Sequence, residues 1–147
     1  MRILIVDRSR TTRRMILNAI RQADASEFLE ASSSREALQR MDHRRADVFI
    51  LGSDLDDRTG IEFTKYIREL PTYKKAPILM VSGLNTHEDL LDAVDAGVDT
   101  YVLLPFREES LLAKVRAALV RARQLAAQKP QILPLKKGYI RRRHVGF

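Results

Sequence analysis

Side chains able to bind a metal ion or a phosphoryl group follow several short apolar runs of this sequence. Asp7 and Ser82 each come directly after such a run. In an open parallel sheet, ligands bind in the crevice beyond the carboxyl ends of the strands, so these residues would share one site. A carboxylate in that place can bind Mg²⁺ or attack phosphorus. The residue that leaves the apolar run 48–51, however, is Gly52, which has no side chain to contribute.

The loop that follows, residues 53–60, is rich in aspartate but does not fit a calcium site. An EF-hand loop that began at Asp54 would need an oxygen ligand at Arg58 and a glutamate at Lys65. We therefore interpret the segment as a solvated acidic loop. The histidines of the chain show no ligand spacing either, so the sequence predicts no metal centre.

Five apolar runs, alternating with amphipathic segments, must position these residues. Most of the runs are apolar throughout, which is typical of a parallel sheet with helices on both faces. Ser9 and Thr86 are of the types that cap helices, and Gly97 is of the type that ends them. We therefore predict an α/β fold. Strands are expected at 2–6, 27–31, 48–51, 78–81 and 101–104, and helices at 10–20, 34–41, 61–70, 87–96 and 108–128.

The composition of the 147-residue chain is that of one globular domain. No apolar run approaches the roughly 20 residues that a membrane span needs. The absence of cysteine excludes disulfides and thiolate metal sites, and it fits a cytoplasmic protein. The net charge of +7 comes from 26 basic and 19 acidic residues, and six of the basic ones lie in 129–147, where no acidic residue occurs. We therefore divide the chain into a nearly neutral domain, 1–128, and a basic tail, 129–147.

Several interpretations of the basic tail stay open. Its charge is carried mainly by Lys136, Lys137, Arg141, Arg142 and Arg143. These side chains could contact nucleic-acid phosphates, an anionic membrane surface or an acidic protein face. The tail could also be a solvated appendage or the start of a further domain. Its interleaved apolar residues favour a segment that docks on a partner.

Six short motifs follow one another along the first three quarters of the chain. They are Ile-Leu-Ile-Val-Asp (3–7), Glu-Ala-Leu (36–38), Thr-Gly-Ile-Glu (59–62), Pro-Ile-Leu-Met-Val-Ser (77–82), Ala-Gly-Val-Asp-Thr-Tyr (96–101) and Pro-Phe (105–106). In this order and spacing the chain resembles the receiver domain of two-component response regulators, over about residues 1–125. The resemblance implies a doubly wound, flavodoxin-like sheet of five parallel strands in the order 2-1-3-4-5. The last helix is expected to extend beyond its usual end.

The resemblance also implies a phosphotransfer site at the carboxyl ends of the strands. In such receivers two adjacent acidic residues after the first strand and an aspartate after the third hold Mg²⁺. The third-strand aspartate attacks phosphorus, and a lysine after the fifth strand neutralises the phosphoryl oxygens. A serine or threonine after the fourth strand and an aromatic residue on the fifth then change position.

Three of the positions that serve this reaction are changed in the present sequence. Asp7 matches the first member of the acidic pair, but Arg8 stands in the second position. Gly52 stands at the phosphoacceptor position, and Leu104 stands at the lysine position. A dication would meet few ligands and a repelling arginine. We therefore predict a pseudo-receiver that has lost Mg²⁺ binding and forms no acyl phosphate in the family manner.

The residual pocket is expected to consist of Asp7, Arg8 and Asp54. We expect Arg8 to fold over the pocket and to pair with Asp7 or Asp54 in place of the missing cation. The alternative is a displaced phosphoacceptor, for which Asp54 and Ser53 are the candidates. Neither is the residue that leaves the strand, and the lysine partner is missing as well.

Ser82 and Tyr101 match the two switch positions, either as a switch driven by a partner or as inherited core and edge residues. The fourth helix, fifth strand and fifth helix would share the surface that the family uses for dimers and targets. We therefore predict a phosphorylation-independent signalling module, not an enzyme, that binds a protein partner or a second copy through this surface. The alternatives are a phosphotransfer-competent regulator and a nucleic-acid-binding regulator that acts through the basic tail.

Overall fold

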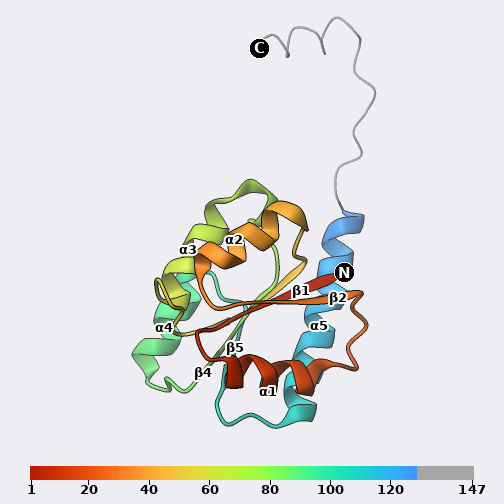
Figure 1. The fold of residues 1–147 in the computed structure, drawn as a ribbon. Coiled ribbons are helices and arrows are strands. Elements are labelled where there is room, and N and C mark those ends of the chain that lie inside the picture. Colours follow the sequence, from red (N-terminus) through yellow and green to blue (C-terminus); the bar gives the residue numbers. More distant parts are fainter. Residues whose placement is uncertain (129–147) are drawn as a thin grey trace, which may run out of the picture.

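The computed structural model describes residues 1–128, which form a parallel sheet covered by helices on both faces (Figure 1). The strand order is β2-β1-β3-β4-β5, which confirms the predicted α/β class and topology. The strands are β1 (Arg2–Val6), β2 (Glu27–Ala31), β3 (Val48–Gly52), β4 (Ile78–Ser82) and β5 (Thr100–Leu103). The helices are α1 (Arg10–Ile20), α2 (Ser34–His43), α3 (Gly60–Glu69), α4 (His87–Ala96) and α5 (Glu108–Ala127), with a single 3-10 turn, η1 (Pro71–Tyr73).

Strand β3 lies at the centre of the sheet, because it pairs with β1 on one side and with β4 on the other. Ile50 lies opposite Ile5 of β1 and Leu79 of β4. All five residues of β3 are buried, which explains why this run is apolar throughout. The carboxyl end of β3 therefore lies between the carboxyl ends of its two neighbours.

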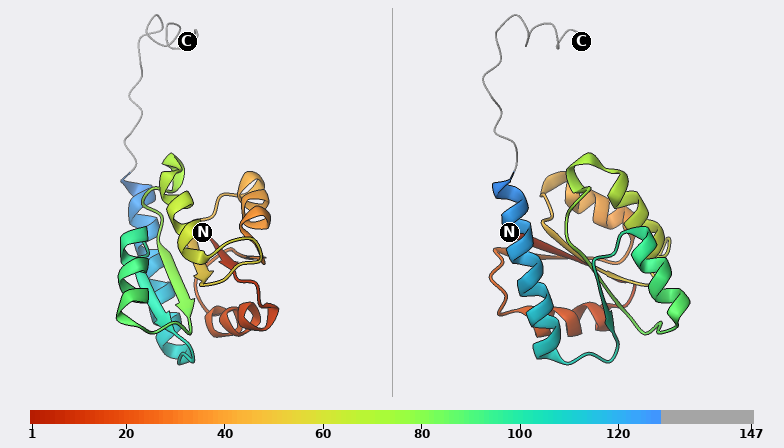
Figure 2. Two further views of the ribbon diagram at one scale, coloured as in Figure 1. Left: turned by 90° about the vertical axis from the view of Figure 1, so that its left-hand side faces the viewer. Right: turned by 180° about the vertical axis from the view of Figure 1, so that it is seen from behind.

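Two hydrophobic cores fill the spaces on either side of the sheet. Alternate residues of a strand point to opposite faces. Ile50 accordingly belongs to the core under α1 and α5, and Phe49 belongs to the core under α2, α3 and α4. Figure 2 shows these two layers of helices from two further directions. Each fully buried side chain of this size contributes about 1.5–3 kcal/mol, so the cores fix the positions of the strand ends.

Side-chain caps determine where several helices begin and end. The Ser9 hydroxyl accepts a hydrogen bond from the Thr12 N–H at 3.1 Å. Thr59 and Thr86 each open a capping box, in which a side chain three residues later bonds back to the N-cap N–H. Gly97 ends α4 with a φ of 109°, a left-handed conformation that glycine adopts without strain.

Arg68 of α3 holds together the segments at the amino end of the sheet. Its Nη2 donates to Gly97 O at 2.7 Å, and its Nη1 donates to Ala76 O at 2.7 Å. The same guanidinium pairs with Asp99 at 3.0 Å. One side chain thus joins α3, the end of α4 and the segments that lead into β4 and β5.

Helix α5 has 20 residues and ends one residue before the predicted boundary. No helix within the described part of the chain combines the length and apolar character that a membrane span needs. The interpretations of the basic tail concern residues 129–147, which lie outside the described residues.

Candidate functional site

Asp7, Gly52 and Ser82 meet at the carboxyl ends of three neighbouring strands. Gly52 is the last residue of β3 and Ser82 the last residue of β4, and Asp7 follows β1 directly. The Asp7 side chain fills the space beside Gly52. A Cβ atom added to Gly52 would overlap Asp7 Oδ2 and would lie 3.2 Å from Asp7 Cβ. A larger residue therefore fits at position 52 only if Asp7 moves.

Asp7 is a carboxylate with little access to water. The residue is 8% exposed, and its Oδ1 accepts a hydrogen bond of 2.7 Å from the Ser9 N–H. Burial raises the pKa of the Asp7 carboxyl, and the nearby Asp54 charge raises it further. The Ser9 N–H, Arg13 and Arg8 act in the opposite direction without cancelling the effect of burial. Asp7 therefore carries its charge at a cost to stability.

The expected ion pair between Arg8 and Asp7 or Asp54 is not formed. The Arg8 side chain is exposed. Arg8 contacts Asp54 only through the backbone, because its N–H donates a hydrogen bond of 3.2 Å to the carbonyl oxygen of Asp54. Arg13 of α1 occupies the inner position instead. Its Nη1 donates to Asp7 O at 2.7 Å, and its Nε donates to Glu30 at 3.2 Å. A basic residue on the polar face of a helix gives no sequence signal for such a contact.

The loop between β3 and α3 exposes Asp54, Asp56 and Asp57, as predicted for a solvated acidic loop, but it is also anchored to α2. The Asp57 carboxylate accepts hydrogen bonds from Ser34 N at 2.8 Å, Ser34 Oγ at 2.6 Å and Arg35 N at 3.1 Å. These donors form the first turn of α2, so Asp57 supplies the negative charge that a helix N-terminus favours. The loop also buries Leu55, and the Asp56 N–H donates to Ser32 O at 3.0 Å.

The pKa of Asp57 reports the strength of this contact. Desolvation of the carboxylate on its own raises the pKa, but the hydrogen bonds from Ser34 and Arg35 outweigh it and lower the pKa to about 2. Asp57 is thus ionised at neutral pH. No local sequence pattern indicates the contact, because Asp57 and Ser34 are 23 residues apart.

The two candidates for a displaced acceptor lie in the same loop, at its beginning. Asp54 is exposed and forms an isolated antiparallel bridge with Thr59. Ser53 is half-buried, and its carbonyl oxygen accepts a hydrogen bond of 2.9 Å from Gly60 N. Gly60 must approach the end of β3 closely, because a Cβ atom there would overlap Gly52 O.

The two switch-position residues bind the backbone of the same residue, Leu84. Ser82 is 1% exposed, and its Oγ accepts a hydrogen bond of 3.0 Å from Leu84 N. The Tyr101 hydroxyl donates to Leu84 O at 2.8 Å. Both polar groups are therefore satisfied by the backbone of the loop that follows β4, and they fix its conformation.

Leu104, at the lysine position, contributes an apolar side chain to the core under α1 and α5. Its N–H donates to Ser82 O at 2.9 Å, which ties the end of β5 to β4. Across residues 1–128, no group of three or more His, Cys, Asp or Glu side chains converges as metal ligands do.

Four exposed apolar side chains lie on α4, on the edge strand β5 and on the loop between β4 and α4. Leu84 is 50% exposed, Leu91 49%, Val94 67% and Leu103 44%. We call these four residues the apolar patch. Helix α4 adds four acidic residues on one side of the edge strand, and α5 adds four basic and two acidic residues on the other. Clustered exposed apolar side chains are typical of a surface that binds another protein.

A doubly wound parallel sheet, with an acidic residue, a hydroxyl and an aromatic residue at or near its strand ends, agrees with the fold and residue types that the resemblance to receiver domains implies. The family model of the response regulator receiver domain matches residues 3–116. The chain therefore belongs to the response regulator receiver domain family, whose members are modules of two-component signalling.

The relatives are single receiver proteins and longer regulators. Chemotaxis protein CheY1 of Helicobacter pylori is 31% identical over 121 residues, which cover 81% of this chain and 97% of that protein. The KDP operon transcriptional regulatory protein KdpE of Escherichia coli is 32% identical over 130 residues, 88% of this chain and 56% of that protein. The solved structure of Vibrio cholerae chemotaxis protein CheY4 has 31% identity and a TM-score of 0.72, and the match covers 80% of this chain and 97% of that chain. A putative response regulator from Chloroflexus aurantiacus has 30% identity and a TM-score of 0.76, covering 82% and 98%.

Proposed function

We propose that this receiver domain does not accept a phosphoryl group in the family manner and that it signals through protein contacts. The observation that carries the proposal is the geometry at Gly52. The residue that should supply the nucleophilic carboxylate has no side chain, and Asp7 fills the space where one would begin. An acyl phosphate needs a carboxylate at that position, so the family reaction has no acceptor.

The remaining residues do not fit the Mg²⁺ that the family implies. Mg²⁺ requires several oxygen ligands in near-octahedral geometry. Asp7 Oδ1 is already bound by Ser9 N, and Gly52 offers no side-chain oxygen. Arg8 adds a positive charge where a second carboxylate would be needed. At the lysine position, Leu104 is partly buried against the core and supplies no charge for phosphoryl oxygens.

The apolar patch supports protein binding as the signalling mode. Its four side chains lie on α4, on β5 and on the loop that Ser82 and Tyr101 fix. The acidic α4 and the basic α5 flank β5, so a twofold pair can place α4 of one copy against α5 of the other. We propose this surface as the site for a second copy or for a partner with the same charge pattern, in a cytoplasmic setting.

The test is a titration with Mg²⁺ and then beryllofluoride, followed by amide NMR on the full chain. We expect no saturable shift at Asp7, Ser53 or Ser82. The control is a chain with Arg8→Asp, Gly52→Asp and Leu104→Lys together, which restores the ligand types and is expected to bind Mg²⁺. Gly52→Asp alone is not expected to do so, because Asp7 and Arg8 remain in place.

Saturable shifts in the unmodified chain would contradict the proposal and favour the displaced acceptor. Acetyl phosphate would then add a phosphoryl group to the chain, detected by mass spectrometry. Asp54→Asn and Ser53→Ala would identify which of the two carries it.

The nucleic-acid alternative rests on the charge of the basic tail alone. It requires binding to DNA or RNA whose affinity falls steeply with salt. Deletion of residues 129–147 should abolish that binding, and Val94→Asp should leave it unchanged. If the affinity for DNA or RNA survives the deletion, the basic tail is not the nucleic-acid-binding segment.

A further inference from the structure

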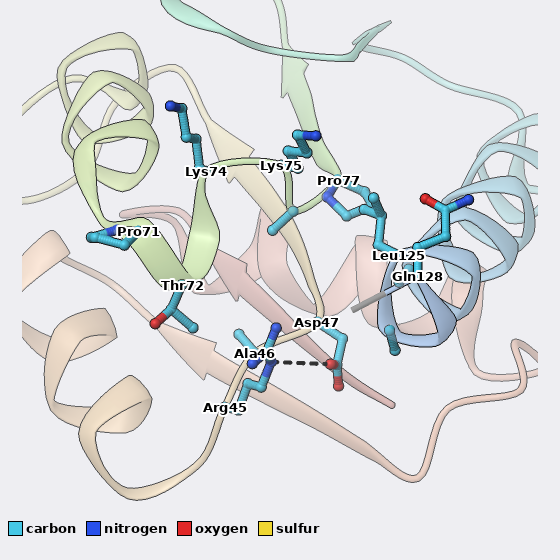
Figure 3. A pocket seen from close by; sticks show the side chains of 13 residues that line it. Arg45, Ala46, Asp47, Pro71, Thr72, Lys74, Lys75, Pro77, Leu125 and Gln128 are labelled. Atoms are coloured by element: carbon cyan, nitrogen blue, oxygen red, sulfur yellow. Dashed lines mark ion pairs between the residues drawn. The ribbon is translucent and has the colours of Figure 1, made fainter. Parts of the chain in front are cut away.

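A groove lies at the amino end of the sheet, at the opposite pole from Gly52. It has a volume of about 610 Å³ and is open to solvent. Three parts of the fold line it: residues 45–47 before β3, residues 71–77 before β4, and the last turns of α5 (Figure 3). None of the residues at the strand ends described above belongs to it, so the groove is a separate feature.

The groove has an apolar floor and a basic rim. Ala46, Ala76, Pro77 and Leu125 contribute aliphatic surface. The rim carries Arg45, Lys74 and Lys75, together with Asp47, whose carboxylate pairs with Arg45 at 3.8 Å. Within residues 1–128, no carboxylate lies within ion-pair distance of Lys74 or Lys75. The floor therefore favours an apolar occupant, and the rim repels a positively charged one.

Gln128, the residue that follows α5, lines this groove. The next residues of the chain therefore begin at its rim. Residues 130–135, Pro-Gln-Ile-Leu-Pro-Leu, carry no charge and include three large aliphatic side chains. Six extended residues reach about 20 Å at most, which is enough to cross a groove of this size. Residues 129–147 lie outside the described part of the chain.

We propose that residues 130–135 dock into the groove of their own chain, with Ile132, Leu133 and Leu135 on the apolar floor. The contact is intramolecular, and a short connection supplies an effective concentration on the order of millimolar. Weak apolar contacts are then sufficient. Two prolines restrict the free segment and reduce the entropy lost on docking.

The basic rim determines the residue at which the docked segment ends. Lys136 and Lys137 follow it directly, and Arg141, Arg142 and Arg143 come shortly after. Like charges repel each other, so Lys74 and Lys75 keep these residues out of the groove. The docked segment thus holds the strongly basic stretch 136–143 at the amino pole, away from the apolar patch. This inference does not depend on whether the domain accepts a phosphoryl group.

The test is methyl NMR on the full chain. We expect nuclear Overhauser effects between the methyl groups of Ile132, Leu133 or Leu135 and those of Ala46, Ala76 or Leu125. The double variant Ile132→Ser/Leu133→Ser should abolish them and shift the amide signals of Ala46 and Ala76. The control variant Ile140→Ser/Val145→Ser changes two apolar residues beyond the segment and should preserve both.

A variant in the groove itself provides a second measurement. Ala76→Lys adds a charge and a long side chain to the floor, and it should move the signals of residues 131–135 to random-coil values. Absence of the expected nuclear Overhauser effects in the unmodified chain would refute the proposal. Nuclear Overhauser effects between residues 132–135 and the acidic α4 would refute it as well. Effects seen only between isotopically distinct copies in a mixed sample would also refute it, because the segment would then dock on a second chain.

Discussion

Replacement of Asp57 by alanine tests the contact between the loop and α2 that sequence reasoning missed. The carboxylate accepts three hydrogen bonds from the first turn of α2. Asp57→Ala removes all three acceptor contacts while leaving the loop backbone unchanged. We expect a clear loss of stability with an unchanged fold.

The magnitude follows from the donors that lose their partner. Ser34 is 1% exposed, so its hydroxyl would be left without this acceptor, at a cost of about 1–3 kcal/mol. Loss of a helix N-cap contact costs about 0.5–2 kcal/mol. Asp57 itself is exposed, and water replaces part of what is lost. We therefore expect a net loss of about 2 kcal/mol, which lowers Tm by about 4–8 °C in a domain of this size.

The effect should depend on pH with a defined sign. The fold lowers the pKa of Asp57 from 3.8 to about 2, so the folded state favours the ionised form. The stabilisation is complete above the unfolded pKa and is lost as the pH falls toward 2. Urea unfolding at pH 7, 4 and 3 should show the difference between Asp57→Ala and the unmodified chain shrinking at the lowest pH.

The neighbouring Asp56 is the matched control. It is exposed, and its hydrogen bond to Ser32 is made by the backbone N–H. Asp56→Ala removes the same charge from the same loop without disturbing the first turn of α2. If the two variants unfold at the same urea concentration at pH 7, the carboxylate contact does not stabilise the fold as argued.

Four further substitutions test other parts of the structure. Asp7→Asn should raise the free energy of unfolding at pH 7, because burial raises the pKa of Asp7 above its ordinary value of 3.8. This gain should shrink as the pH falls through the raised pKa and vanish below 3.8, and a loss in urea unfolding would contradict the prediction. Gly52→Ala should destabilise by about 1–3 kcal/mol through the overlap with Asp7, and Asp7→Ala in the same chain should restore most of this. Arg68→Met should cost about 3 kcal/mol, because it removes charged hydrogen bonds to several backbone carbonyls; an unchanged Tm would refute this role. Val94→Asp should weaken self-association or partner binding in sedimentation at least tenfold, whereas Met15→Asp, at an apolar side chain 45% exposed on α1, should not.

The fold was predictable because its signals are local and repeated. Each buried strand is a run of four or five apolar residues, and Gly97 marks the end of α4 by its residue type. The strand order was predictable only through the resemblance to receivers, because the sequence of a single strand does not indicate which other strand pairs with it. The absent side chain at Gly52 could likewise be read directly from the sequence.

The contacts around the site could not be predicted, because they depend on side-chain directions. Arg8 lies next to Asp7 in the sequence, yet it is exposed to solvent. Arg13, on α1, instead donates a hydrogen bond to the Asp7 carbonyl oxygen. Asp57 and Ser34 meet only because α2 and the loop after β3 lie on the same side of the sheet. A sequence pattern gives the faces of helices and strands, but not which of two neighbouring arginines points inward.

The two hydrogen bonds to Leu84 connect Ser82 and Tyr101 through the backbone of one residue. The N–H and C=O of Leu84 belong to consecutive peptide groups, so a rotation of this residue strains both bonds together. The Leu84 side chain is itself half exposed within the apolar patch. A protein bound there would act on a buried hydroxyl and an edge aromatic through a single backbone residue. If binding at the apolar patch changes an equilibrium at Ser82, linkage requires that a shift of that equilibrium change the affinity for the bound protein by the same factor.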